Sequence, residues 1–296
     1  MPGDTSGMTP ELRWWVAAVT AAALLLVAGC SSPAPRSVTA AEPPAASSPT
    51  VPPGRDSTAL PAVGVPGVND STCRSEQPPL ILLHGTFSTV RSTFAAMVPA
   101  LQASGRCVYA TPYGAGGTGP VRSSSEQVAG FVRDVLELTG AQQVDVVGYS
   151  QGGLVLRTAL RDEGLAPLVG TAVLIAPSFH GTTSPLIGQL PTGLCPACDD
   201  QAAGSSLLRK LNAGGDLDGD VRYAVVSTSK DTVVTPVASQ VPDGPADRIR
   251  SLLMQDRCPG STVDHARLPA DPGVIGWTVD ALDTRGRPDP GALTCR

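Results

Sequence analysis

The sequence GYSQG at residues 148–152 has the Gly-x-Ser-x-Gly form that can present a serine hydroxyl for nucleophilic attack. The pentapeptide alone is weak evidence, because the chain contains 32 glycines. Its setting is stronger, since residues 144–147 are an apolar run typical of a buried strand and residues 153–156 resemble the start of a helix. A tight turn between strand and helix lifts the serine clear of a sheet and needs glycines where a side chain would clash. The pattern therefore predicts Ser150 as a nucleophile.

A serine nucleophile needs an imidazole base within hydrogen-bond reach. The chain contains three histidines. In folds that carry this turn, the order along the chain is serine, acid, histidine. His84 precedes the serine and so does not fit this order. His180 follows the predicted strand at residues 172–175, where the order serine, acid, histidine cannot be met. By elimination, His265 is the predicted base.

The carboxylate that orients the imidazole is expected just after the penultimate strand. The predicted strand at residues 223–226 runs into a short polar segment that ends at Asp231, which we take as the acid. Asp264 is the immediate neighbour of His265 and is poorly placed to reach its Nδ1. Three other aspartates lie among glycines in what the composition indicates is a solvated turn: Asp216, Asp218 and Asp220.

Acyl transfer also needs hydrogen-bond donors for the oxyanion of a tetrahedral intermediate. The backbone N–H of Gln151, directly after the serine, is one expected donor. The second is expected from the loop after the first core strand, where Thr86 follows Gly85 and offers both an N–H and a hydroxyl. An ordinary turn at the end of a strand is the alternative interpretation of that loop.

These residues must be held by a sheet with helices on both faces. Continuous apolar runs, rather than strict alternation, are typical of parallel strands covered on both sides. The sequence predicts an α/β-hydrolase fold, as a single domain with a mostly parallel central sheet. The predicted strands are residues 80–83, 107–110, 144–147, 172–175 and 223–226. The predicted helices are residues 93–102, 124–138, 152–161, 205–211 and 273–282.

The N-terminal segment has a different composition. Residues 14–29 are apolar, follow Arg13 and end at Cys30, in a pattern that resembles the lipobox of bacterial lipoproteins. A transmembrane anchor is the alternative. We expect a signal peptide at residues 1–29, lipid on Cys30, a Pro/Ala/Ser-rich tether at residues 30–70 and the folded domain at residues 71–296. The expected location is the cell envelope, with the lipid holding the protein to the outer face of the cell membrane.

Seven cysteines are present, and lipid on Cys30 would leave an even number, as is common in exported proteins. Six cysteines allow 15 pairings, of which we prefer Cys73–Cys107, Cys195–Cys198 and Cys258–Cys295. The CPAC segment that contains the middle pair lacks the strand-then-helix setting of redox motifs, so a structural bridge is favoured. Two thiols without nearby histidines also make a poor zinc site, and no metal is expected.

Net charge is −5 and no basic stripe is present, which excludes nucleic-acid binding as an expected function.

Most of residues 73–296 resemble a known family, the lipases typified by Candida antarctica lipase B, together with secreted actinobacterial lipases. The similar segments occur in the same order, namely residues 150–155, 176–177, 181–182, 204–207, 211–215, 227–236 and 264–266. The resemblance implies Ser150, Asp231 and His265 as the triad, with Thr86 and Gln151 at the oxyanion. It also implies two of the disulfides, Cys73–Cys107 and Cys258–Cys295. Departures from the family are His84 in place of a proline and Tyr149 in place of a tryptophan.

The expected activity is hydrolysis of carboxylic esters, with lipid esters as the expected substrates and no metal or organic cofactor required. An envelope acyltransferase that uses the same triad is the first alternative, and a surface lipoprotein without catalysis is the second. The sequence leaves the oligomeric state open.

Overall fold

The computed structural model describes residues 60–188 and 193–295. The predicted signal peptide, Cys30 and most of the predicted tether lie outside the described residues. Within the described part of the chain, no helix is long and apolar enough to cross a membrane.

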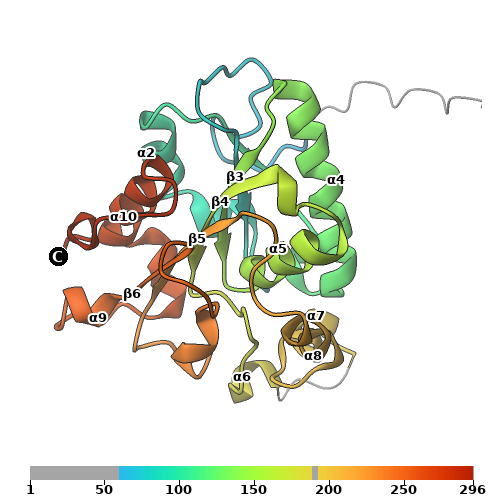
Figure 1. Ribbon diagram of the computed structural model, residues 1–296, viewed down its shortest axis with the longest axis vertical. Coiled ribbons are helices and arrows are strands. Elements are labelled where there is room, and N and C mark those ends of the chain that lie inside the picture. Colours follow the sequence, from blue (N-terminus) through green and yellow to red (C-terminus); the bar gives the residue numbers. More distant parts are fainter. Residues whose placement is uncertain (1–59, 189–192, 296) are drawn as a thin grey trace, which may run out of the picture. The chain divides into compact units, whose positions relative to one another are not determined.

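A six-stranded parallel sheet forms the centre of this unit, in the order β2-β1-β3-β4-β5-β6 (Figure 1). Every neighbouring pair of these strands is parallel. The strands are β1 (Leu80–Leu83), β2 (Val108–Ala110), β3 (Val144–Tyr149), β4 (Val169–Ile175), β5 (Arg222–Ser227) and β6 (Ile249–Leu253).

Helices connect these strands. The α-helices are α1 (Val90–Phe94), α2 (Val98–Ala103), α3 (Gly114–Gly117), α4 (Val121–Thr139), α5 (Gln151–Asp162), α6 (Pro185–Gly188), α7 (Pro196–Gln201), α8 (Ser206–Ala213), α9 (Met254–Arg257) and α10 (Pro272–Asp283). Four short 3₁₀ helices are described as well, η1 (Ala166–Leu168), η2 (Val237–Gln240), η3 (His265–Ala270) and η4 (Pro290–Ala292).

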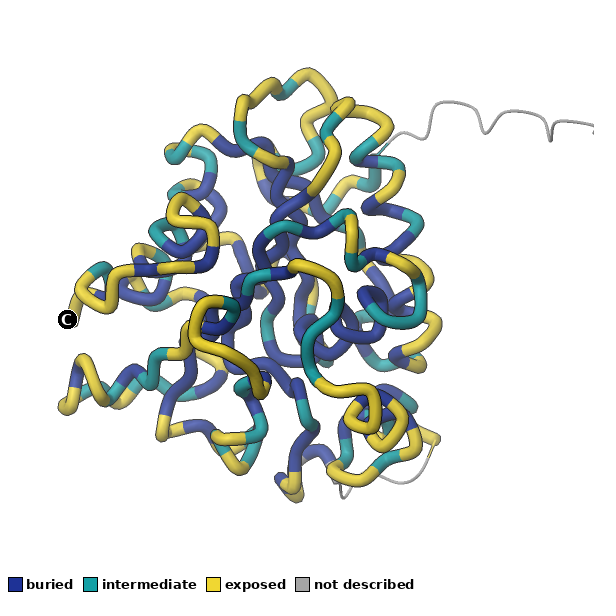
Figure 2. Tube along the Cα trace, viewed as in Figure 1, coloured by how far each residue is buried: buried dark blue, intermediate teal, exposed yellow. Residues whose placement is uncertain are grey.

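Both faces of the sheet are covered, as the continuous apolar runs predicted. Ile81 and Leu83 of β1 pack into one core with side chains of α4, α5 and α8. Leu80 and Leu82 point the other way, into a second core with side chains of α1, α2 and α10. Figure 1 shows α4 and α2 on opposite sides of the sheet, and Figure 2 shows the buried strands between them. The predicted α/β-hydrolase architecture is confirmed.

All five predicted strands are present, but the sixth was missed. β6 lies at the edge of the sheet, and its Arg250 and Ser251 are exposed, so it lacks a continuous apolar run. The single helix predicted at residues 93–102 is two helices instead, α1 and α2. Pro99 lies in the first turn of α2, where a proline is tolerated although it breaks a continuous helix.

Residues 60–70 already pack on the sheet, although their composition placed them in the tether. Val65 is buried, and Val68 forms an isolated parallel bridge with Val108 of β2. The Asn69 side chain donates to the carbonyl of Ala110 at 2.7 Å and accepts from its N–H at 2.9 Å. A segment rich in proline and glycine can therefore be ordered by pairing with a strand edge, which its composition does not reveal.

Candidate active site

Ser150 stands in the tight turn between β3 and α5. Its φ is +53°, in a region that residues other than glycine rarely adopt. Glycine is required beside it, because a Cβ on Gly152 would lie 2.3 Å from the carbonyl oxygen of Leu83. The predicted strand-to-helix turn is therefore present, and it presents the serine at the carboxyl end of the parallel sheet.

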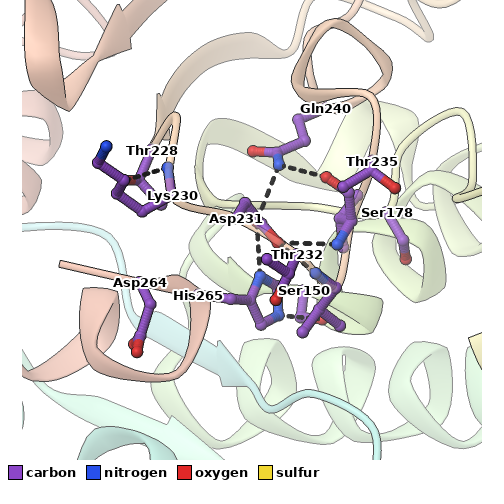
Figure 3. A network of polar contacts seen from close by, with 12 residues as sticks. Ser150, Ser178, Thr228, Lys230, Asp231, Thr232, Thr235, Gln240, Asp264 and His265 are labelled. Atoms are coloured by element: carbon purple, nitrogen blue, oxygen red, sulfur yellow. Dashed lines mark hydrogen bonds and ion pairs between the residues drawn. The ribbon is translucent and has the colours of Figure 1, made fainter. Parts of the chain in front are cut away.

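The structure brings Ser150, His265 and Asp231 together from three separate segments (Figure 3). His265 Nε2 lies 3.0 Å from Ser150 Oγ, and His265 Nδ1 lies 2.7 Å from Asp231 Oδ2. All three residues are buried. A carboxylate on Nδ1 leaves the lone pair of Nε2 facing the serine hydroxyl, which is the arrangement required for base-assisted attack on a carbonyl carbon.

The loop that carries His265 is fixed from both sides. Tyr149 Oη donates to the backbone carbonyl of His265 at 3.2 Å, and Thr228 Oγ1 donates to that of Val263 at 2.7 Å. Burial raises the pKa of Tyr149 well above its usual range, so its hydroxyl stays a donor. Asp264 caps the start of η3 by accepting from Arg267 N, and the carboxylate at the imidazole Nδ1 is that of Asp231.

Asp231 follows β5 and accepts four hydrogen bonds. Its Oδ1 accepts from the backbone N–H groups of Val233 and Val234, both at 2.8 Å. Its Oδ2 accepts from His265 and from Gln240 Nε2, at 2.7 and 2.9 Å. Sequence reasoning missed Gln240, because a single glutamine in a loop has no pattern that links it to a carboxylate.

The loop that carries Thr86 approaches the serine, and Gln151 directly follows it. A Cβ on Gly85 would lie 3.2 Å from Ser150 Cβ, so the loop that carries Thr86 approaches the serine more closely than a larger residue would allow. Gln151 is the first residue of α5, and the N–H groups in the first turn of a helix have no partner within that helix. Its buried side chain donates to the carbonyl of Gly117 at 2.8 Å.

A second glutamine that sequence reasoning missed holds the Thr86 hydroxyl. Gln201 of α7 is buried, and its Nε2 donates to Thr86 Oγ1 at 2.9 Å. Its Oε1 accepts from Ser178 Oγ at 3.0 Å, which fixes the orientation of the amide. Because Thr86 Oγ1 accepts this bond, its own hydrogen is available to another acceptor.

The two other histidines lie outside this constellation. His84 is buried, stacks on Tyr113 at 4.2 Å between ring centroids, and its Nδ1 lies 2.8 Å from the carbonyl oxygen of Gly85. Burial lowers the pKa of His84 below its usual range. His180 Nε2 lies 2.7 Å from Asp216 Oδ2.

The interpretation of Asp216, Asp218 and Asp220 as a solvated turn was wrong for the first two. Arg157, which is buried, pairs with Asp216 at 2.7 Å, and Arg161 pairs with Asp218 at 2.9 Å. The side chain of Asp220 is exposed, as expected. The two arginines come from α5, so these ion pairs join the helix behind the serine to the loop that precedes β5.

All six cysteines in the described part of the chain are bridged in the preferred pairs, Cys73–Cys107, Cys195–Cys198 and Cys258–Cys295. The middle bridge closes the first turn of α7, the helix that ends at Gln201. Among the residues that the structure describes, no three histidine, cysteine, aspartate or glutamate side chains form a group able to hold a metal ion.

Comparisons with known proteins bear on the family and the fold. Residues 77–256 match the profile of the family described as Lipase (class 2). Lipase B of Aspergillus fumigatus is similar in structure, with a TM-score of 0.62 and 24% identity over 72% of this chain. The match covers 54% of that enzyme, so this chain spans about half of its length. A protein of Listeria innocua matches with a TM-score of 0.52 and 14% identity, over 74% of this chain and 98% of its own. No curated protein matches.

Proposed function

The chain belongs to the class 2 lipase family of α/β-hydrolases, and from this premise we propose that it hydrolyses lipid esters through an acyl-enzyme on Ser150. The observation that carries the proposal is the line of contacts from Ser150 Oγ through His265 to Asp231, at 3.0 and 2.7 Å. An unassisted serine hydroxyl is a poor nucleophile, and this arrangement supplies both the base and the group that orients it.

In the first half of the proposed reaction, Ser150 Oγ attacks the carbonyl carbon while its proton passes to His265 Nε2. Asp231 stabilises the imidazolium that forms. The Gln151 N–H and the N–H and hydroxyl of Thr86 donate to the oxyanion. When the tetrahedral intermediate collapses, the bond to the alcohol oxygen breaks, the alcohol takes the proton from His265, and the acyl group remains on the serine.

In the second half of the proposed reaction, water hydrolyses the acyl-enzyme. It loses a proton to His265 Nε2 as it attacks the acyl carbon, and the same donors hold the second oxyanion. Collapse breaks the ester bond to Ser150, whose oxygen regains the proton, and the carboxylic acid leaves. Atoms and protons balance without a metal or an organic cofactor.

Two exposed apolar side chains support a lipid substrate over a small soluble ester. Phe87 directly follows Thr86 and is 63% exposed, and Leu194 directly precedes the Cys195–Cys198 bridge and is 69% exposed. The hydrogen bond between Thr86 and Gln201 joins the two segments that carry them. Contiguous exposed apolar patches mark surfaces that meet other apolar surfaces, and the proposal takes Phe87 and Leu194 as parts of such a surface.

The test compares hydrolysis of a short p-nitrophenyl ester with that of emulsified triacylglycerol, using the wild-type protein and the Ser150→Ala variant. The proposal is supported if the wild type hydrolyses both substrates and Ser150→Ala hydrolyses neither. Turnover of the short ester only would leave an esterase and remove the lipid substrate. Equal turnover by Ser150→Ala would remove the serine mechanism.

We also propose that the protein is exported and anchored to the outer face of the cell membrane by lipid on Cys30. The apolar segment before Cys30 supports this proposal, as do the three disulfides, because such bridges persist in oxidising compartments. Fractionation of cells tests it. The wild type is expected with the membrane, and Cys30→Ala is expected to lose the lipid, as read by mass spectrometry. An unmodified Cys30 would contradict the anchor.

A further inference from the structure

Gln240 lies at the end of η2 and is fully buried beside the proposed catalytic acid. We infer that Gln240 is a positioning residue, which orients the Asp231 carboxylate and stabilises its anionic form while His265 carries the proton. The inference rests on the proposed function, because it assigns a role within the same triad. Figure 3 shows Gln240 reaching Asp231 from the side opposite to Ser150.

The orientation of the Gln240 amide is determined by its neighbours. Its Nε2 lies 2.9 Å from Asp231 Oδ2 and 2.9 Å from the carbonyl oxygen of Val234. Both atoms are acceptors, so only the NH₂ group of the amide can face them. The reversed amide would place its oxygen against a carboxylate and a carbonyl at once. The side chain therefore donates two hydrogen bonds from one nitrogen.

These contacts complete the hydrogen bonding of Asp231. A carboxylate offers about four lone-pair sites, and Val233 N, Val234 N, His265 Nδ1 and Gln240 Nε2 provide four donors. Because donors occupy both oxygens, the plane of the carboxylate is fixed relative to the imidazole. Donors also stabilise the anionic form of a carboxylate. A neutral amide does so without adding a charge that would compete with the imidazolium.

A purely structural role explains Gln240 less well. Its Oε1 is buried and has no hydrogen-bond partner among the described residues. A buried polar atom without a partner destabilises the folded protein, and a methionine of similar length would fill the space without that atom. The amide is therefore explained by the two hydrogen bonds that its Nε2 donates, one of them to Asp231, rather than by packing.

The test replaces Gln240 with methionine and uses Thr278→Val as a matched control. Thr278 also has a buried polar atom without a partner, Oγ1, but it lies in α10 and outside the site. We expect Gln240→Met to lower kcat about 10-fold, and urea unfolding shows whether the variant is folded. The control is expected to keep the wild-type kcat.

The pH profile separates positioning from packing. Without the Gln240 donor, the Asp231 carboxylate is no longer fixed against the imidazole and stabilises the imidazolium less, so the acid limb of kcat/KM is expected to move to lower pH, by up to about one unit. The low-field NMR signal of the proton between His265 and Asp231 is expected to move as well, in the free protein and without substrate.

Two outcomes overturn the inference. One is a Gln240→Met variant with the kcat, acid limb and low-field signal of the wild type. The other is a fall in kcat accompanied by an unchanged acid limb and an unchanged signal, which would indicate altered packing alone. If the wild type itself does not hydrolyse esters, the proposed function fails, and the NMR signal still tests the contact between Gln240 and Asp231.

Discussion

Replacing Asp231 with asparagine is expected to leave the fold intact and to remove most of the activity. Asp231 Oδ1 accepts two backbone hydrogen bonds, so the asparagine carbonyl oxygen takes that position. Its NH₂ group then replaces Oδ2, where it faces two donors, His265 Nδ1 and Gln240 Nε2. A hydrogen-bond donor then faces another donor at both contacts. The imidazole removes the unfavourable contact at Nδ1 by changing tautomer, so that its proton moves from Nδ1 to Nε2.

The proton on Nε2 then points at Ser150 Oγ, 3.0 Å away, and the base can no longer accept the serine proton. A wrong imidazole tautomer of this kind lowers kcat by about 10⁴-fold in serine proteases. At roughly 1.36 kcal/mol for each factor of ten, this is about 5.5 kcal/mol of transition-state stabilisation. We expect a loss of the same order here.

The assay is kcat for a short p-nitrophenyl ester, with Asp264→Asn as the matched control. Asp264 caps η3, and asparagine caps helices about as well as aspartate, so the control is expected to keep nearly all activity. Urea unfolding shows whether both variants are folded. A kcat for Asp231→Asn within tenfold of the wild type would refute the role given to this carboxylate.

Three further predictions concern the oxyanion site, a disulfide and a buried histidine. Thr86→Val removes the hydroxyl but keeps the N–H, so kcat is expected to fall about 10²-fold; a fall of less than about threefold would argue against that donor. Replacing Cys258 and Cys295, 37 residues apart, with alanine is expected to lower the free energy of unfolding in urea by about 4 kcal/mol, and an unchanged urea midpoint would contradict this. Because burial lowers the folded-state pKa of His84, the unfolded chain binds the extra proton, and stability present above about pH 6.5 is lost as the pH falls. In urea titrations, the free energy of unfolding of His84→Asn should decline less over this pH range than that of the wild type. An equal decline in both proteins would rule the explanation out.

The sequence predicted what depends on local pattern. The strands that flank the site are continuous apolar runs, and a run such as residues 80–83 has the same bounds in the structure as in the prediction. The turn at Ser150 was predicted because glycines, a strand and a helix coincide there. Chain order then led to His265 and Asp231, which the structure places within hydrogen-bond distance of each other.

What the sequence did not reveal depends on contacts between distant segments. Gln240 and Gln201 have no periodic or compositional signal, and only the folded chain brings them to Asp231 and Thr86. Asp216 resembled a surface turn, because nothing near it in the sequence indicates that Arg157 would pair with it. Polar groups buried by tertiary contacts are the class of residue that pattern reasoning misses here.

The most direct test of the account is labelling of the purified protein with a fluorophosphonate probe, which reacts with activated serines. The account predicts that the wild type is labelled, that Ser150→Ala is not, and that His265→Ala is labelled far more slowly. A folded wild-type protein that stays unlabelled, or a Ser150→Ala variant that is labelled as fast as the wild type, would contradict the claim that His265 activates Ser150.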